Sequence, residues 1–144
     1  MVPKIDRNKA LATRLVEEVW NSKRPQLITD IFSEEFATST PGGVLYGPQG
    51  YRKIYDTYVE AFPDCQIKIA DILGEGDQVV IRFVFRGTHQ GSLMGVKPTA
   101  RQVSIPGIII MRVQSDKIVD QQVVWDTLSM LEQLQAVSLD TPNQ

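Results

Sequence analysis

The clearest structural pattern in this chain lies between Gln78 and Asp126, where the sequence reads QVVIRFVFRGTHQGSLMGVKPTARQVSIPGIIIMRVQSDKIVDQQVVWD. Apolar and polar side chains alternate along much of it with a period of two, as they do in a strand that buries one face. The short turn Gln114-Ser115-Asp116 predicts a hairpin near its end. Together these signals predict three long strands, Gln78–His89, Arg101–Gln114 and Lys117–Trp125.

The middle strand of the three is apolar on both faces. Ile108 and Ile110 fall on one face, and the opposite face carries Val103, Ile105, Gly107, Ile109 and Met111. Such a strand is covered on one side by its own core and on the other side by a second surface. We therefore expect a homodimer that forms through the outer face of the sheet, around Ile108, Ile110 and Val124.

Helical spacing of apolar residues predicts three helices before the long strands. The first runs from an N-cap at Asp6 to about Asn21. A short second helix begins at Pro25 and includes Phe32 in its buried face. The third spans about residues 47–62 and is ended by Pro63.

The remaining segments complete the predicted order of elements. Residues 36–46 are rich in turn formers and predict a rim hairpin or loop, and a further strand starts at Cys65. A loop is expected over residues 91–100, a short helix over residues 128–134 and a loose tail over residues 140–144. This order predicts an α+β fold, a cone-shaped α+β barrel in which a strongly curved antiparallel sheet wraps around three helices, with a short C-terminal helix.

The composition narrows the classes of function. The formal net charge of -2 over 144 residues and the scattered lysines and arginines argue against nucleic acid or an anionic membrane as a partner. A single cysteine and a single histidine suggest no metal site, and we expect no cofactor. No apolar run approaches the ~20 residues of a membrane-spanning helix. Because the N-terminus has no signal-peptide pattern, we expect a cytoplasmic protein.

Several short motifs follow one another in an informative order. They are Trp20-Asn21, Ala61-Phe62-Pro63-Asp64, Gly74-Glu75-Gly76-Asp77, Gly87-Thr88-His89-Gln90-Gly91, Gly95–Arg101, Asp116-Lys117-Ile118-Val119 and Trp125-Asp126. This series resembles the SnoaL-like polyketide cyclase family of the nuclear-transport-factor-2-like (NTF2-like) superfamily. The resemblance implies one domain over residues 1–144 with a core of about 6–136, a deep ligand pocket, and dimers built through the outer sheet face.

The chain departs from the family at the positions that carry its chemistry. Cyclases of this family use an aspartate on the last strand as general acid or base, three residues before the position of Asp126, where this chain has Val123. They also carry a glutamine and a histidine on the preceding strand, at the positions of Gly107 and Ile109. An isopropyl group cannot move a proton, so the family mechanism does not carry over residue by residue. The paired carboxylates of the related epoxide hydrolases have no counterpart on these strands either.

His89 is the first candidate for catalysis, because histidine is the side chain whose unperturbed pKa lies near neutrality. It shares the parity of Phe83 and Phe85, which would place it inside the cup near the mouth as a general base. The alternative is that His89 organises the Gly87–Gly91 turn.

Asp126 is the second catalytic candidate, as a carboxylate base at the end of the cup. The alternative is that it caps the last helix. Strand parity favours the cap, because it places Val119, Gln121 and Val123 toward the pocket and Asp126 on the other side. Gln121 is then a polar inward residue able to form a hydrogen bond with a ligand carbonyl.

The predicted ligand-binding residues share an inward, mostly apolar or aromatic character. Trp20 is included because the family has a pocket-lining aromatic residue there. Each tyrosine of the third helix is either packed in the core or aims its hydroxyl at a ligand carbonyl. The full set is Trp20, Tyr51, Tyr55, Tyr58, Phe83, Phe85, Ile109, Met111, Gln121 and Val123.

Two classes of function fit these observations. The first is a cofactor-free cyclase or isomerase that folds a hydrophobic, carbonyl-bearing metabolite, such as a polyketide or terpenoid, inside an apolar cup. The second is a non-catalytic protein of the same fold that binds a hydrophobic ligand or serves as a dimeric interaction module. Val123, Gly107 and Ile109 favour the second class, because they make the base of the cup poor in acids and bases.

Overall fold

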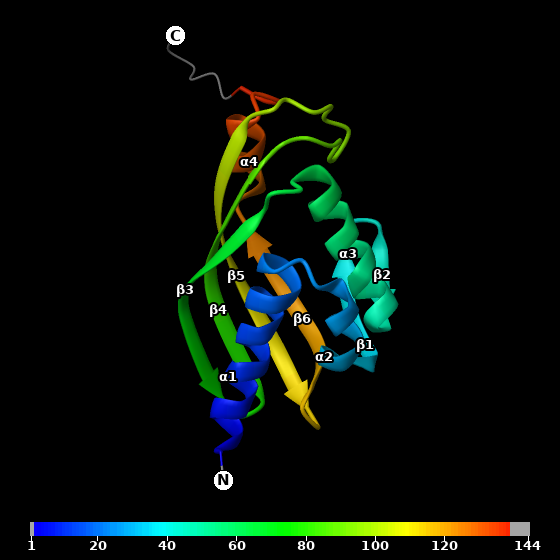
Figure 1. The fold of residues 1–144 in the computed structure, drawn as a ribbon, viewed down its shortest axis with the longest axis vertical. Coiled ribbons are helices and arrows are strands. Elements are labelled where there is room, and N and C mark those ends of the chain that lie inside the picture. Colours follow the sequence, from blue (N-terminus) through cyan, green and yellow to red (C-terminus); the bar gives the residue numbers. More distant parts are fainter. Residues whose placement is uncertain (1, 139–144) are drawn as a thin grey trace.

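The computed structural model describes residues 2–138, and the tail Asp140–Gln144 that was expected to be loose lies outside them. Figure 1 shows helices α1 and α3 lying against one face of a curved sheet, with α4 at the opposite end of the molecule from the N-terminus. No helix within residues 2–138 is long and apolar enough to cross a membrane.

The sheet has six strands in the order β2-β1-β6-β5-β4-β3. All neighbouring pairs are antiparallel except β1 and β6, which run parallel. The strands are β1 (Phe32–Thr40), β2 (Gly43–Tyr46), β3 (Gln66–Glu75), β4 (Gln78–Thr88), β5 (Gln102–Gln114) and β6 (Lys117–Trp125). The sheet begins and ends on unpaired edges at β2 and β3, so it forms an open cone.

The helices fill the concave side of this cone. Helix α1 (Lys4–Arg14) continues without a break into a π-helical segment, η1 (Leu15–Asn21). A 3-10 turn, η2 (Pro25–Leu27), leads into α2 (Ile28–Ile31). Helix α3 (Gly47–Ala61) follows the β1–β2 hairpin, and α4 (Thr127–Gln133) follows β6.

The hydrophobic core forms where the inner face of the sheet meets these helices. Along β5, buried and exposed residues alternate over almost the whole strand, with Val103, Ile105, Gly107, Ile109 and Met111 inside. The β5–β6 hairpin turns through Ser115 and Asp116, whose φ angles of 51° and 59° are those of a two-residue turn that matches the twist of the strands.

The α+β cone predicted from the sequence is confirmed, with three local corrections. The sheet is mixed and open, because β1 lies parallel beside β6, a strand about eighty residues later in the chain. Phe32 begins β1 and is no part of the second helix. Helix α1 starts at Lys4 after Pro3, so Asp6 lies in the first turn and is not the N-cap. Its negative charge there interacts favourably with the positive end of the helix dipole.

Candidate active site inside the cone

Most of the predicted ligand-binding residues lie together on the inside of the cone. Phe83, Phe85, Ile109 and Met111 line the sheet side, and Trp20, Tyr51 and Tyr55 face them from the helices; all seven belong to the buried core. Val123 differs, because 44% of its surface remains exposed although it pairs with Ile109 on the inner face. The interior is therefore densely packed at its centre and open beside the second half of β6.

Trp20 and Tyr51 form a hydrogen-bonded pair within this interior. The indole Nε1 of Trp20 donates to the Tyr51 hydroxyl oxygen over 2.8 Å, and the ring of Tyr51 stacks on Phe32 with centroids 3.9 Å apart. Burial raises the pKa of the Tyr51 phenol well above its usual value, although the hydrogen bond from Trp20 opposes the shift. Tyr51 therefore stays protonated, and its own O–H remains able to donate a hydrogen bond.

The π-helical segment determines where Trp20 points. A π-turn holds one more residue than an α-turn, so side chains that follow it are rotated about the helix axis. In η1 the residues that become buried are Leu15, Val16, Val19 and Trp20. The rings of Trp20 and Tyr55 lie 5.0 Å apart as a result. The segment thus directs the indole toward α3.

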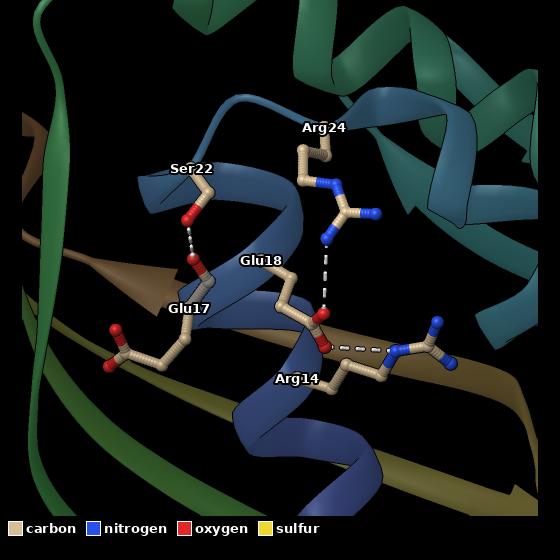
Figure 2. Close-up of polar contacts among 5 residues, drawn as sticks. All are labelled: Arg14, Glu17, Glu18, Ser22 and Arg24. Carbon is tan, nitrogen blue, oxygen red and sulfur yellow. Dashed lines mark hydrogen bonds and ion pairs between the residues drawn. The ribbon is translucent and has the colours of Figure 1, made fainter.

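Polar contacts hold the outer side of this segment (Figure 2). The Glu18 carboxylate accepts a hydrogen bond from Arg14 Nε at 2.9 Å and lies 3.4 Å from Arg24 Nη1. The Ser22 hydroxyl donates to the main-chain carbonyl of Glu17 over 3.0 Å. Exposed ion pairs of this kind each stabilise a fold by less than about 1 kcal/mol. Their effect here is to connect the residues before, within and after the π-turn.

A second aromatic group lies where β6 approaches α4. The ring of Trp125 makes edge contacts with Tyr58, at a centroid distance of 5.1 Å, and with Phe85, at 5.7 Å. Burial raises the pKa of Tyr58, so its hydroxyl is also neutral. Trp125 is not among the lining residues predicted from the sequence. Its shared parity with Gln121 and Val123 was the signal that would have found it.

Gly107 leaves little room for a side chain at its position on β5. A Cβ atom on Gly107 would come within 2.5 Å of Phe83 Cζ and 2.8 Å of the Trp125 Cβ. The Phe83 ring therefore occupies the space above Gly107. The absence of a side chain on Gly107 therefore accommodates a phenylalanine ring that fills the interior.

Gln121 and Val123 project from β6 into the cone opposite Met111 and Ile109. The register of β5 and β6 shifts between Arg112 and Val113, which leaves Val119 outside the ladder and turns Ile118 inward. The expectation that Val119 faces the interior is corrected by this bulge. Gln121 is only 7% exposed, and its Oε1 has no hydrogen-bond partner among the described residues.

His89 is completely buried and serves the loop that follows β4. Its Nδ1 accepts a hydrogen bond from the Thr99 main-chain N–H over 3.1 Å, and its main chain pairs with Arg101 and Ala100. The ring proton must therefore sit on Nε2, since an acceptor nitrogen carries none. Burial lowers the pKa of His89 below its usual value, and its Nε2 has no hydrogen-bond partner among the described residues. In this arrangement the ring has no free lone pair for a ligand proton.

Asp126 begins helix α4. Its Oδ1 accepts a hydrogen bond from the Ser129 main-chain N–H over 2.9 Å, which is the contact of an N-cap. The carboxylate is exposed to solvent. The structure thus brings most of the predicted ligand-binding residues together around one interior and leaves His89 and Asp126 tied to the main chain at its margin. Residues 2–138 contain no cluster of three or more side chains suited to hold a metal ion.

The open α+β cone with helices on its concave face defines the NTF2-like fold. Within this class, the chain belongs to the SnoaL-like polyketide cyclase family, whose model matches residues 10–134. No curated protein matches the chain.

Solved structures of similar fold support this assignment. AclR from Streptomyces galilaeus, described as a candidate hydroxylase, is 26% identical with a TM-score of 0.83, covering 97% of this chain and 88% of its own. TsrD from Streptomyces laurentii is 21% identical with a TM-score of 0.85, over 95% and 100% of the two chains. A candidate SnoaL-like polyketide cyclase from Jannaschia sp. CCS1 is 18% identical with a TM-score of 0.86, over 96% and 98%.

Proposed function

We propose that this chain is a cofactor-free cyclase or isomerase that acts on a hydrophobic, carbonyl-bearing metabolite of polyketide or terpenoid type. One observation carries the proposal, which is the neutral hydroxyl of Tyr51, held by Trp20 inside an apolar interior. A donor fixed in a medium of low dielectric stabilises negative charge on a carbonyl oxygen far more than water does. Its orientation is set before the substrate arrives, so no reorganisation is needed during the reaction.

An intramolecular aldol closure is a reaction that a hydroxyl donor in an apolar interior can assist. The enol form of the substrate supplies the nucleophilic carbon, a carbon–carbon bond forms to the carbonyl carbon, and the proton released from the enol oxygen ends on the carbonyl oxygen, which becomes a hydroxyl. The reaction is redox-neutral and requires only acid–base steps. Tyr51 would hold the carbonyl oxygen as negative charge develops, and the enclosing walls would bring the two carbons together.

The Tyr51 hydroxyl offers a direct test. We expect the protein to accelerate ring closure in a panel of diketones that includes heptane-2,6-dione, and Tyr51→Phe to lose at least about tenfold of that acceleration. Tyr46→Phe is the matched control, because Tyr46 is 68% exposed on the outer side of β2. Product formation is followed by liquid chromatography and mass spectrometry. Equal rates for wild type and Tyr51→Phe would remove the proposed role.

A second candidate function is a non-catalytic carrier of a hydrophobic ligand. It is favoured by the inner face of the described strands, where position 123 is a valine and the buried polar side chains are Gln121 and Thr38. Isothermal titration of the same diketones separates the two functions. Binding without turnover in the wild-type protein supports the carrier, and turnover that depends on Tyr51 supports the enzyme.

We also propose that the protein forms a homodimer through the outer face of the sheet. Exposed apolar side chains gather there on neighbouring strands, including Ile108, Ile110 and Val124, and Val124 is 74% exposed. A hollow of about 690 Å³ adjoins this surface, and its lining includes Ile110, Val124 and Val44 together with Thr38, Gln121 and Val123. An apolar surface of this extent is typical of a face that another chain covers.

A further inference from the structure

Three described side chains have a buried polar atom without a hydrogen-bond partner, namely Asn8 Nδ2, His89 Nε2 and Gln121 Oε1, and Gln121 is the one on a strand of the sheet. Its Oε1 has no hydrogen-bond partner within residues 2–138, and the residue is more than nine-tenths buried. Buried amide groups are almost always paired, because an unpaired one loses its hydrogen bonds to water and gains nothing in return. A glutamine kept in this state needs a partner that the folded chain does not itself supply.

The neighbours of Gln121 explain why the chain leaves this oxygen unpaired. Met111, which pairs with it across the ladder, and Val123, two residues along the same face, have no group that can donate. Thr38 lies nearby on β1, but its hydroxyl donates to the main-chain oxygen of Gln121 over 3.2 Å. The Thr38 hydroxyl proton is therefore already used on the backbone.

The polar groups of Gln121 and Tyr51 are complementary, and both belong to the interior of the cone. Gln121 and Thr38 line the hollow of about 690 Å³, and Tyr51 lies buried behind it, with its ring 6.0 Å from that of Phe36, two residues before Thr38 on β1. The hydroxyl of Tyr51 accepts from Trp20 and keeps its proton to donate. One group thus offers a hydrogen and the other offers an oxygen acceptor.

We propose that Gln121 is a specificity-determining residue whose Oε1 accepts a hydrogen bond from a ligand hydroxyl. The proposed substrate then carries a hydroxyl donor for Gln121 as well as a carbonyl for Tyr51, as the enol form of a β-dicarbonyl compound or a phenolic ketone does. This inference rests on the proposed function, because it concerns the ligand of the same interior.

The inference is tested with two probes that differ only in the hydrogen-bond donor. Binding of 2-naphthol and of 2-methoxynaphthalene is measured by isothermal titration, and the ratio of their dissociation constants is compared between proteins. We expect Gln121→Leu to weaken the binding of 2-naphthol about tenfold relative to that of 2-methoxynaphthalene, because one buried hydrogen bond is lost. Gln102→Leu makes the same chemical change at an exposed position of β5 that does not line this hollow and should leave the ratio unchanged.

The binding ratio and the turnover assay together separate the role of Gln121 from the proposed function. An equal ratio in wild type and Gln121→Leu overturns the inference while leaving the proposed function in place. A ratio that shifts as expected, without any turnover of the diketones, supports Gln121 as a selector and removes the catalytic proposal. No binding of either probe by the wild-type protein overturns both. Should Gln121→Leu fail to fold, Gln121→Met provides the same comparison with a side chain of similar length.

Discussion

The indole Nε1 of Trp20 lies 2.8 Å from the hydroxyl oxygen of Tyr51, across a sequence separation of 31 residues. This hydrogen bond joins the π-helical end of the first helix to the start of α3. It fills one lone pair of the phenol and leaves its proton free. Because both residues are buried, the pair orients a donor in a region that water reaches poorly.

The Trp20–Tyr51 pair should be visible as a coupling energy. Tyr51→Phe leaves the indole N–H buried without a partner, and we expect the free energy of unfolding to fall by about 1–3 kcal/mol. Trp20→Phe combined with Tyr51→Phe should cost less than the sum of the single changes, because the second change removes a group that is already unpaired. Urea denaturation of the four proteins measures this. Strict additivity would show that the hydrogen bond contributes nothing to stability.

Gln121→Leu should make the protein more stable while it weakens selection of a hydroxyl-bearing ligand. Replacing an unpaired buried amide by an apolar side chain of similar volume removes a desolvation penalty of about 1–3 kcal/mol. The melting temperature should rise, as in other sites where function is kept at the expense of stability. A fall in melting temperature would mean that the amide is satisfied in the folded protein.

A larger residue at position 107 should lower the free energy of unfolding. In Gly107→Ala the new methyl group would meet the Phe83 ring at 2.5 Å and the Trp125 Cβ at 2.8 Å. Overpacking of this kind costs about 1–3 kcal/mol, and Phe83→Leu in the same chain should restore part of it. The control is Gly42→Ala, whose nearest neighbour would be the Thr40 hydroxyl at 3.9 Å. Thermal unfolding that is unchanged in Gly107→Ala would show that the Phe83 ring moves freely.

Acid should destabilise the protein through His89. Burial lowers the folded-state pKa of His89 below the ordinary value of 6.5, so the neutral ring is favoured by folding. The stability it contributes is present above the unfolded pKa and is lost as the pH falls through the folded pKa. Protonation would also place a hydrogen on Nδ1, against the Thr99 N–H.

The measurement is simple because the chain has one histidine. An NMR titration of its imidazole protons gives the folded pKa directly. The free energy of unfolding should fall more steeply below pH 6.5 in wild type than in His89→Phe, which cannot titrate. A folded pKa at or above 6.5 would contradict this expectation.

Val124→Asp should convert the proposed dimer into a monomer. The substitution places a charge on the most exposed apolar residue of the outer face, where a partner would have to bury it. Met94→Asp is the matched control, because Met94 is 60% exposed in the loop that follows β4 and lies away from this face. Analytical ultracentrifugation at micromolar concentration gives the masses. A wild-type protein that sediments as a monomer would remove the homodimer.

Local patterns were enough to predict the long strands and most of the interior. The alternation in β4 and β5 assigned Phe83, Phe85, Ile109 and Met111 to one face, and all four are buried there. This succeeded because the side-chain period of a strand is fixed by its backbone geometry. The same reasoning placed Val119 on the wrong face, because a bulge shifts the alternation of faces and no residue type in the sequence marks its position. Helix periodicity likewise gave no sign of the π-turn that aims Trp20.

The amino-acid order alone thus determined the α+β class, the strand faces and the absence of an aspartate at position 123, all of which depend on neighbours in the chain. Tertiary structure decided what the polar side chains do. It set β1 parallel to β6, tied His89 to Thr99 and paired Trp20 with Tyr51. It also left the Gln121 oxygen without a partner, since hydrogen bonds between distant segments form only once packing has brought those segments together.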